Sequence, residues 1–418
     1  MRFIVIGAGL LGLSSAYYLS AQGHRVTMID RHAGPGLGTS FANAGMVTPS
    51  QAEPWNMPGI LPKVIGWLGR EDAPVLLRPA ALGSLFFWGL RFLRNSSPRR
   101  FHANALSNAR LARFSLAALH ELRRKEALDY GQICRGSLKI YRDLDAFAEG
   151  VSLANLLKDT GVSPNILDPG GALRLEPALQ DVVGRLIGAI HFPDDESGNA
   201  HRFCSALAAT LSRQGVEVCG NVEASGFVVT RGRASALQTS KGAMEADGFV
   251  LCAGSHAPAL GAGIGLHLPI QPVKGYSITV PMSGSGIKPG MPVVDDARHV
   301  AMTPLDGLLR VAGTAEFAGF DLGLTPGRIE NLKQVVGEVF PGFAPGPAMD
   351  VSAWAGLRPY TCDGVPIIGR ANLDNVYVNT GHGHLGWTLA AGSGKLLSQL
   401  VSGSAPDIDP APYSPMRF

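Results

Sequence analysis

Apolar and polar positions at the start of the chain follow a strand pattern, then a helix pattern, then a strand pattern again. Residues 3–6 are a run of β-branched and aromatic residues, and this run stops at the small residues 7–9. Residues 10–21 place apolar side chains at helical spacing, and residues 26–29 form a second apolar run. This order predicts a βαβ unit of about 30 residues with a glycine-rich turn after its first strand.

Similar runs recur along the rest of the chain and predict further helices and strands. An amphipathic pattern predicts a helix at 201–214, and another helix is expected at 387–401. Two predicted strands, 249–251 and 375–379, run into glycine turns as the first strand does. Short β-branched and aromatic runs predict other strands at 216–218, 227–230, 234–237, 277–280, 300–302 and 308–311.

The glycine turn after the first strand has the spacing of a dinucleotide-binding loop. Gly7 permits a tight turn, Gly9 lets the backbone approach a pyrophosphate, and Gly12 lets the helix pack closely on the strand. Phosphates would then meet free N–H groups at the positive end of the helix. Asp30 ends the second strand, where its carboxylate is placed to accept hydrogen bonds from ribose hydroxyls. The alternative is an ordinary glycine-rich turn in a parallel sheet.

The same N-terminal stretch also has the layout of a secretory signal peptide, because Arg2 precedes an apolar run that small residues follow. Cleavage inside residues 10–21 would destroy the glycine loop. We therefore expect the mature chain to begin at Met1 or Arg2.

Composition indicates a folded protein with a large core and little net charge. The chain has 418 residues, of which 46% are apolar and 17% charged, and its formal net charge is +3. These values exclude a disordered chain, and the positive excess is too small to indicate nucleic-acid binding. Five widely separated cysteines without a CxxC motif favour reduced thiols in a cytoplasmic protein over disulfides or a metal site.

One segment differs from the rest in charge. Residues 73–120 contain no Asp or Glu, and their arginines are interleaved with apolar and aromatic residues that include Phe87 and Trp88. The apolar run within the segment is too short to span a bilayer, which takes about 20 residues. The pattern has two interpretations: a surface that lies on an anionic membrane, or a core helix with a solvated basic face.

Together these patterns predict an α/β protein. An NAD dehydrogenase would use the first βαβ unit, but a second strand-to-glycine turn and a glycine loop before the C-terminal helix are more typical of an FAD protein. We expect a discontinuous Rossmann-like FAD-binding domain formed by residues 1–50, 200–270 and 350–418. We expect a substrate domain with a mixed β-sheet, and a helical insertion at about 73–120, in residues 51–199 and 271–349.

Several longer motifs resemble those of one family of flavoenzymes. They are TSFANAGMVTPS at 39–50, FPDDESGNAHRF at 192–203, PVKGYS at 272–277, GTAE at 313–316, WAGLRPYTCDGVPIIG at 354–369 and NTGHGHLGWTLAAGSGKLL at 379–397. In these motifs the chain is similar to the D-amino-acid dehydrogenase branch of the glycine/D-amino-acid oxidase family. The resemblance covers essentially the whole chain.

The resemblance implies a set of FAD-binding residues. The ADP half of FAD would be held by Gly7, Gly9, Gly12, Asp30 and Arg31. The ribityl chain and flavin ring would be lined by Ser40, Asn43, Ala44, Gly45 and Met46. The adenine would meet Val222, and the pyrophosphate would meet Ala253 and Gly254. Backbone N–H groups near the flavin pyrimidine edge would come from Gly381, His382, Gly383, Leu385 and Gly386.

The resemblance also implies three residues at the substrate. Arg358 matches the family's substrate arginine, whose guanidinium binds a carboxylate with two parallel hydrogen bonds; the alternative is a structural pair with Asp363. Tyr276 is a candidate to hydrogen-bond the same carboxylate, or else a packed core residue. His384 lies where a relative has an arginine near the substrate. It and His382 are equally well explained as loop residues satisfied by backbone.

The implied function is FAD-dependent oxidation of a D-amino acid by hydride transfer to flavin, which gives an imino acid that hydrolyses to a 2-oxo acid and ammonia. Two alternatives remain: a dehydrogenase of D-proline or hydroxy-D-proline, and a flavin subunit of a larger amine-oxidising complex. Residues 73–120 favour a quinone or other membrane carrier over oxygen as electron acceptor. We therefore expect a cytoplasmic protein with peripheral contact to the inner face of the cell membrane.

Overall fold

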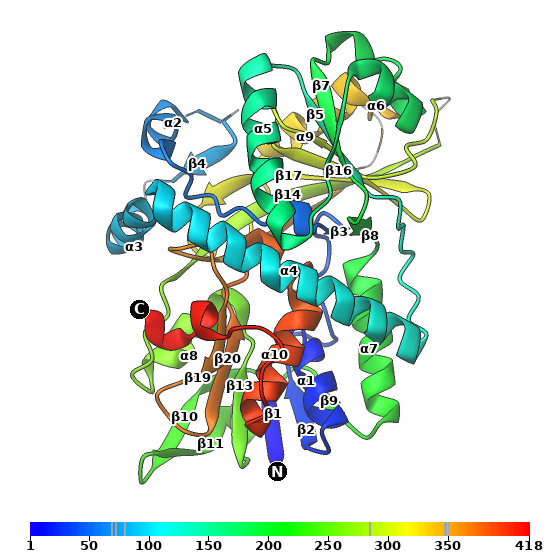
Figure 1. Cartoon of the computed structure of the whole chain (residues 1–418). Coiled ribbons are helices and arrows are strands. Elements are labelled where there is room, and N and C mark those ends of the chain that lie inside the picture. The colour runs from blue at the N-terminus through cyan, green and yellow to red at the C-terminus, as the bar shows by residue number, and fades with distance from the viewer. Residues whose placement is uncertain (68–69, 72, 79–80, 284–285, 347–348, 350) are drawn as a thin grey trace.

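Two β-sheets, one above the other, organise the molecule (Figure 1). The computed structural model describes residues 1–67, 70–71, 73–78, 81–283, 286–346, 349 and 351–418. Within these residues a six-stranded sheet forms the lower half in Figure 1, and a nine-stranded sheet forms the upper half. The helices lie on the faces of the two sheets and at the junction between them. The predicted α/β class is confirmed.

The lower sheet contains the predicted βαβ unit. Its strand order is β19-β20-β13-β1-β2-β9, parallel except for β19. The strands are β1 (Arg2–Ile6), β2 (Arg25–Ile29), β9 (Glu217–Cys219), β13 (Gly248–Leu251), β19 (Ile367–Arg370) and β20 (Val376–Thr380). Helix α1 (Leu10–Ala21) spans the predicted range. Because β1 and β13 are fully buried after Arg2 and lie side by side, both of their glycine turns face the same edge of the sheet.

Helices and a small sheet cover the two faces of the lower sheet. One face packs in a shared apolar core with α1, α4 (Pro98–Glu126), α7 (Ala200–Arg213) and α10 (Ala390–Ser402). The other face packs against α8 (Ala257–Ala262) and a three-stranded sheet of β10 (Ala224–Thr230), β11 (Arg233–Thr239) and β12 (Gly242–Glu245). Strands β10 and β11 are the predicted hairpin.

The upper sheet is mixed, as predicted. Its main path is β18-β14-β17-β16-β15-β5-β7-β6, and β4 pairs with β17. The strands are β4 (Val75–Leu77), β5 (Ser137–Tyr141), β6 (Asn165–Leu167), β7 (Gly188–Phe192), β14 (Ile270–Pro281), β15 (Val293–Asp295), β16 (Val300–Leu305), β17 (Leu308–Phe317) and β18 (Ser352–Thr361). Helices α6 (Pro169–Leu175) and α9 (Pro326–Val339) share its apolar core, and α5 (Leu144–Leu157) packs beside β5 and β7.

Strand β18 joins a different sheet from the one that its place in the sequence suggests. It lies within residues 350–418, which we expect in the FAD-binding domain, yet it pairs with β14 from Ile270↔Thr361 to Thr279↔Ser352. This long antiparallel ladder makes β18 an edge of the upper sheet. The chain returns to the lower sheet only at β19, so β18 runs along the junction between the two sheets.

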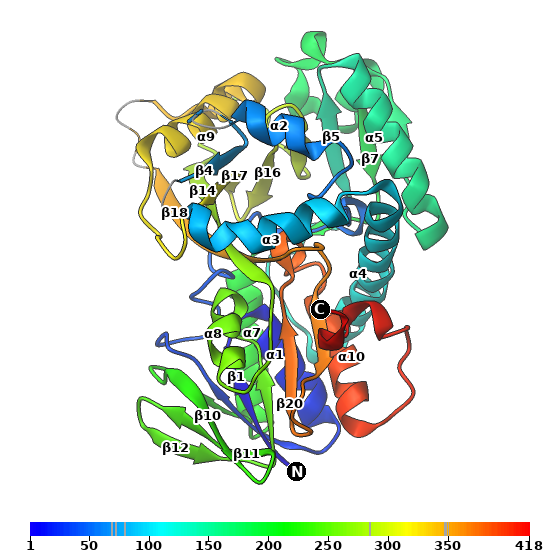
Figure 2. The same cartoon turned by 90° about the vertical axis from the view of Figure 1, so that its left-hand side faces the viewer.

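Helices α3 (Leu82–Asn95) and α4 occupy most of the basic segment 73–120, and they differ in burial. In α4, Leu111 and Leu119 are buried in the core around α1 and α10, so this helix is a core helix. In α3, which lies across the junction (Figure 2), Phe87 is 77% exposed. Trp88 was expected at the same surface, but it is buried and stacks on Phe92. Among the described residues, no helix combines the length and apolar character needed to cross a membrane.

Candidate active site

A large cavity lies at the junction of the two sheets. Its volume is about 1670 Å³, whereas pockets for a single small ligand are typically about 300–1,000 Å³. The predicted residues that line it are Gly7, Gly9, Asp30, Arg31, Ser40, Asn43, Ala44, Gly45, Met46, Val222, Ala253, Gly254, Tyr276, Arg358, His382, Gly383, His384 and Gly386. The structure therefore brings together most of the predicted nucleotide and substrate residues, from segments far apart in the chain.

Three predicted cofactor residues lie behind the cavity wall. A Cβ on Gly12 would lie 1.8 Å from the Gly7 carbonyl oxygen, so Gly12 is where α1 packs against the turn. Gly381 has φ +76°, and a Cβ there would lie 2.6 Å from Thr361 Cγ2. Leu385 is buried in the core of the lower half. Their contribution to a cofactor site would be to shape the backbone in front of them.

The glycine turn fits the pyrophosphate of a dinucleotide. Gly7 has φ +110°, and a Cβ there would lie 2.6 Å from the Cys252 carbonyl oxygen, so the turn is compatible only with glycine. Gly9 stands at the N-terminus of α1 and lines the cavity. A Cβ on Gly9 would meet Ser40 Oγ at 3.2 Å, on the cavity side of the turn. The turn thus leaves its backbone open to a phosphate at the positive end of a helix.

Asp30 holds this turn in place. Its Oδ2 accepts a hydrogen bond from the Ala8 N–H at 2.7 Å, and its Oδ1 accepts one from the His32 N–H at 2.8 Å. A carboxylate has about four lone-pair positions, so the two backbone bonds leave capacity for a ribose hydroxyl at the cavity wall.

Arg358 is a cation without a matching carboxylate. A Cβ on Gly275, in the neighbouring strand β14, would lie 2.3 Å from its guanidinium carbon, so that glycine makes room for the side chain. The guanidinium Nη1 donates to the Thr314 carbonyl at 2.8 Å, and its carbon lies 5.7 Å from the Trp55 ring. Burial lowers the pKa of Arg358 to about 10, so it stays charged at neutral pH.

The alternative structural pair of Arg358 is not formed. Asp363 instead accepts from Arg417, whose Nε lies 2.8 Å from Asp363 Oδ2. Among the described residues no carboxylate forms a salt bridge with Arg358. A charge left in a poorly solvated cavity is costly unless it is paired, so Arg358 is placed to bind an anionic group from outside the protein.

His384 belongs to a stack of rings beside Arg358. The Trp55 ring lies 4.6 Å from the Tyr360 ring and 5.4 Å from the His384 ring, and each pair is stacked. His384 Nε2 donates to the Gln51 carbonyl at 3.3 Å, and Nδ1 has no described partner. Burial, with a smaller effect from Arg358, lowers the pKa of His384 to about 4. The imidazole is therefore neutral at physiological pH.

His382 is the second histidine of the glycine loop. Its Nε2 lies 2.9 Å from Ser393 Oγ in α10, and its residue forms a β-bridge with Tyr360. Burial lowers the pKa of His382 to about 3, so this imidazole is also neutral. Neither histidine is placed as a charged acid in the cavity.

Comparison with known proteins agrees with this geometry. The model of the FAD dependent oxidoreductase family, DAO, matches residues 2–400. The chain belongs to this family. A protein of Paramagnetospirillum magneticum named D-amino acid dehydrogenase is 44% identical, covering 96% of this chain and 95% of the relative. One of Xanthobacter autotrophicus with the same name is 41% identical, covering 100% and 99%.

A solved structure supports the fold. Glycine oxidase from Geobacillus kaustophilus is 24% identical, with a TM-score of 0.76 that covers 100% of this chain and 99% of that one. The protein is therefore an oxidoreductase of the DAO family with FAD as its cofactor. The open turn and the cavity at the sheet junction fit this cofactor.

The contacts of Tyr276 in this DAO-family site favour the second of its two interpretations, a packed core residue. Its hydroxyl donates to Glu316 Oε2 at 2.5 Å and lies 3.0 Å from Thr325 Oγ1. Glu316 also binds Arg78 and Lys274. Because the phenol is committed to this buried ion cluster, the interpretation of Tyr276 as a packed residue explains the structure better than a bond to substrate.

The residues that hold the backbone beneath the ring stack are not indicated by the sequence motifs. Asp195 is buried, and its Oδ2 accepts hydrogen bonds from Ser50 Oγ at 2.5 Å and Ser137 Oγ at 2.6 Å. Burial raises its pKa to about 7. Ser50 precedes Gln51, the partner of His384, so Asp195 anchors the backbone under the stack. Asp195 belongs to the acidic pair of the FPDDES motif, but its position in the sequence does not indicate its partners Ser50 and Ser137.

Proposed function

We propose that the enzyme is a dehydrogenase of D-amino acids, which it oxidises to imino acids that hydrolyse to 2-oxo acids and ammonia. The observation that carries this proposal is the uncompensated Arg358 guanidinium in the same cavity as the nucleotide turn. The names of the relatives support an amino acid and its D configuration. When bound, FAD supplies the acceptor for the hydride of the α-carbon.

Arg358 would hold the substrate carboxylate. A planar guanidinium meets a carboxylate with two parallel hydrogen bonds, which fix the direction of the α-carbon as well as its distance. Its Nη1 is already tied to Thr314, and the face of Trp55 lies 5.7 Å away. The arginine therefore has little freedom to follow a misplaced substrate, which favours one orientation in the cavity.

Trp55, Tyr360 and His384 would exclude water from the reacting carbon. Trp55 and His384 line the cavity, the buried Tyr360 ring supports them in the stack, and the neutral His384 adds no charge to this wall. A neutral imidazole does not repel the positive charge that develops at the imino carbon. Because it carries no charge, it also does not compete with Arg358 for the substrate carboxylate. If the amine binds in its neutral form, hydride transfer requires no acid–base pair from the protein.

The cofactor would be held along the lower edge of the cavity. The turn of Gly7 and Gly9 would bind the pyrophosphate, and Asp30 the ribose. Val222 lies beside Asp30, since its N–H donates to the Asp30 carbonyl at 2.8 Å, and would meet the adenine. The remaining predicted FAD contacts on the cavity wall are Arg31, Ser40, Asn43, Ala44, Gly45, Met46, Ala253, Gly254, His382, Gly383 and Gly386.

The test of the proposed reaction is anaerobic reduction of the bound flavin by the two enantiomers of alanine. D-alanine should bleach the visible flavin absorbance, and pyruvate and ammonia should then accumulate when a dye acceptor is supplied. L-alanine should leave the absorbance unchanged.

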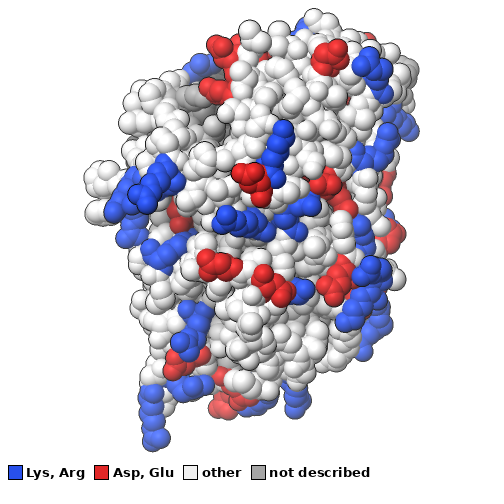
Figure 3. Space-filling model, viewed as in Figure 1, with Lys and Arg blue, Asp and Glu red and all other residues white. Residues whose placement is uncertain are grey.

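A second part of the proposal concerns the electron acceptor. One face of the molecule carries exposed apolar side chains on α2 (Ile60–Trp67) and α3: Leu61, Ile65, Phe86, Phe87, Leu90 and Leu93. Lys and Arg side chains gather beside α3 and the start of α4 (Figure 3). Basic residues beside exposed apolar ones suit an anionic lipid surface. We call the exposed apolar residues of α2 and α3 the α2–α3 surface.

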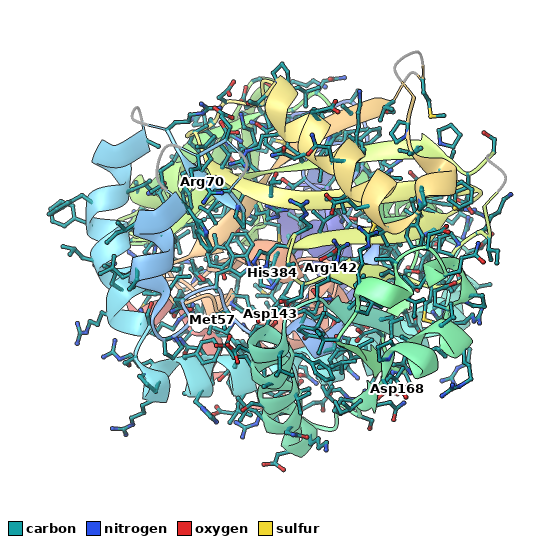
Figure 4. All side chains as sticks on the ribbon, turned by 90° about the horizontal axis from the view of Figure 1, so that it is seen from above. Met57, Arg70, Arg142, Asp143, Asp168 and His384 are labelled. Carbon is teal, nitrogen blue, oxygen red and sulfur yellow. The ribbon has the colours of Figure 1, made fainter. Side chains whose placement is uncertain are left out.

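An arm of the cavity lies beneath the α2–α3 surface. Leu61 and Val64 of α2, and Leu85 and Leu93 of α3, line the same cavity as His384. Viewed from above, Met57 lies on the α2–α3 side of His384 (Figure 4). We infer that an apolar acceptor such as a quinone enters here from the inner face of the cell membrane.

Vesicle binding tests the α2–α3 surface. We expect the protein to bind anionic vesicles more than neutral ones, with less binding at high salt, because salt screens exposed charges beyond about 8 Å. Phe86→Ser with Phe87→Ser should weaken binding roughly tenfold or more, since burial of one such side chain contributes about 1.5–3 kcal/mol. Val229→Ser, an exposed apolar position on β10, is the matched control. Equal binding by the double variant would contradict the proposal.

A further inference from the structure

Glu53 is a buried acid in the cavity that the proposed reaction does not use. It lies between Gln51, the partner of His384, and Trp55, and it lines the same cavity as Arg358. Its Oε2 is buried without a hydrogen-bond partner among the described residues. Burial raises the pKa of Glu53, so the carboxylate form lacks adequate compensation in the protein itself. A buried carboxylate without a hydrogen-bond or ionic partner destabilises the folded protein.

Lys139, whose charge acts on Glu53, is already paired. Lys139 Nζ lies 2.8 Å from Asp296 Oδ1 and 5.5 Å from the centre of the Tyr141 ring. Lys139 and Asp296 also line the cavity. With Lys139 matched by Asp296, Glu53 is left as an acid without a cationic partner of its own in this part of the wall. A cation that enters the cavity would compensate the carboxylate form of Glu53 and so favour its ionisation.

Glu53 and Arg358 face the same space with opposite charges. Burial raises the pKa of Tyr360, and the charges of Glu53 and Arg358 act on this same phenol in opposite directions. The Tyr360 hydroxyl accepts from the Trp55 N–H at 2.7 Å, which ties the segment of Glu53 to the strand of Arg358. Among the described residues Glu53 and Arg358 form no salt bridge with each other, so each keeps polar atoms available for a separate group of one ligand.

We propose that Glu53 binds a cationic group on the substrate side chain, and that the enzyme prefers basic D-amino acids such as D-arginine and D-lysine. This inference rests on the proposed function, in which Arg358 binds the α-carboxylate. The α-amine is a poorer partner for Glu53. A carboxylate beside the amine would keep it protonated, whereas the amine must be neutral when the hydride leaves. A D-amino acid whose side chain ends in an ammonium or guanidinium would offer this cation to Glu53 and its carboxylate to Arg358.

A pair of substrates of equal length tests the proposal. D-citrulline has the shape of D-arginine, but its terminal urea group is neutral. We expect the wild-type kcat/KM for D-arginine to exceed that for D-citrulline by about tenfold or more, since a hydrogen bond to a charged group contributes roughly 1.5–3 kcal/mol. In Glu53→Gln, which keeps the shape and removes the charge, this ratio should fall to near one.

Controls separate this effect from a structural one. Asp145→Asn removes an exposed acid on α5 that does not line the cavity, and it should leave the ratio unchanged. Glu53→Asp keeps the charge and should retain part of the preference. Flavin content and Tm of each variant show whether it is folded.

Two results would overturn the assignment of Glu53. One is a wild-type ratio near one, and the other is an equal loss for both substrates in Glu53→Gln, which would place the carboxylate at the α-amine. In either case D-alanine would still bleach the flavin. If D-alanine and the two longer substrates all fail to do so, the proposed function itself is wrong, and the inference about Glu53 falls with it.

Discussion

Replacement of Arg358 by alanine should reduce kcat/KM for D-amino acids by about thirty-fold or more. The reason is that the loss of one partner of a buried charged pair costs roughly 2–5 kcal/mol, at about 1.4 kcal/mol per tenfold change. Arg358→Lys keeps the charge but loses the planar fork, so its kcat/KM should lie between those of the alanine variant and the wild type. Flavin reduction by D-alanine, followed at low substrate concentration, measures the effect.

Two comparisons make the Arg358 result specific. Ethylamine lacks the carboxylate, so its slow reaction should be nearly the same in wild type and Arg358→Ala. Arg370→Ala is the matched control, because Arg370 is an exposed arginine on β19 that pairs with Asp374 and does not line the cavity. Wild-type rates in Arg358→Ala would contradict the clamp, as would loss of flavin with activity per flavin unchanged.

Replacement of Gly12 by valine should abolish stable FAD binding. Any Cβ at this position would lie 1.8 Å from the Gly7 carbonyl oxygen, and backbone cannot yield as a flexible side chain does. Helix α1 would have to move away from β1, and the N–H groups of the turn would move with it. Overpacking of this kind costs about 1–3 kcal/mol or more, and the stabilisation that a bound ligand gives would also be lost.

The ratio of flavin absorbance to protein absorbance after purification measures this loss, together with Tm before and after addition of FAD. Gly66→Ala is the matched control, since Gly66 lies in α2 and a Cβ there meets nothing within 4 Å. A Gly12→Val protein with normal flavin content and Tm would show that the turn does not hold the cofactor as described.

The local parts of the fold were predictable because short-range patterns determine them. The strand 3–6, the glycine turn and the helix Leu10–Ala21 follow from hydrophobic period and glycine positions alone. Residues 350–418 show the limit of this approach. The strand Ser352–Thr361 has no local feature that selects its sheet, and its pairing with β14 depends on a register set about eighty residues earlier in the chain.

The site residues divide in the same way. Arg358 was found through its motif, but whether it pairs with Asp363 depends on Arg417, which fills that role from the C-terminus. For Tyr276 the sequence left substrate binding and core packing both open, because its partner Glu316 is 40 residues away on another strand. In each case the hydrogen-bond partner comes from a distant segment, and sequence spacing carries no information about it.

The basic segment 73–120 had two interpretations because its charge pattern shows that one face of each helix is polar. It does not show whether the apolar face contacts a membrane or the protein core. An absence of acids fits a membrane surface and a core helix equally well. The structure divides the segment, with one side of α4 buried in the core around α1 and α10 and the side chains of α3 partly exposed. Trp88 and Phe87 are adjacent in sequence, yet helical geometry turns one inward and the other outward.

The central claim is that a D-amino acid, held by Arg358, reduces flavin in the cavity between the two sheets. The most direct measurement is the absorbance of the purified, oxygen-free flavoprotein as D-alanine or D-arginine is added. We predict saturable loss of the visible flavin band with the D enantiomers and none with the L enantiomers. A flavin band that is unchanged by every D-amino acid, in a protein with a full content of FAD, would contradict the account.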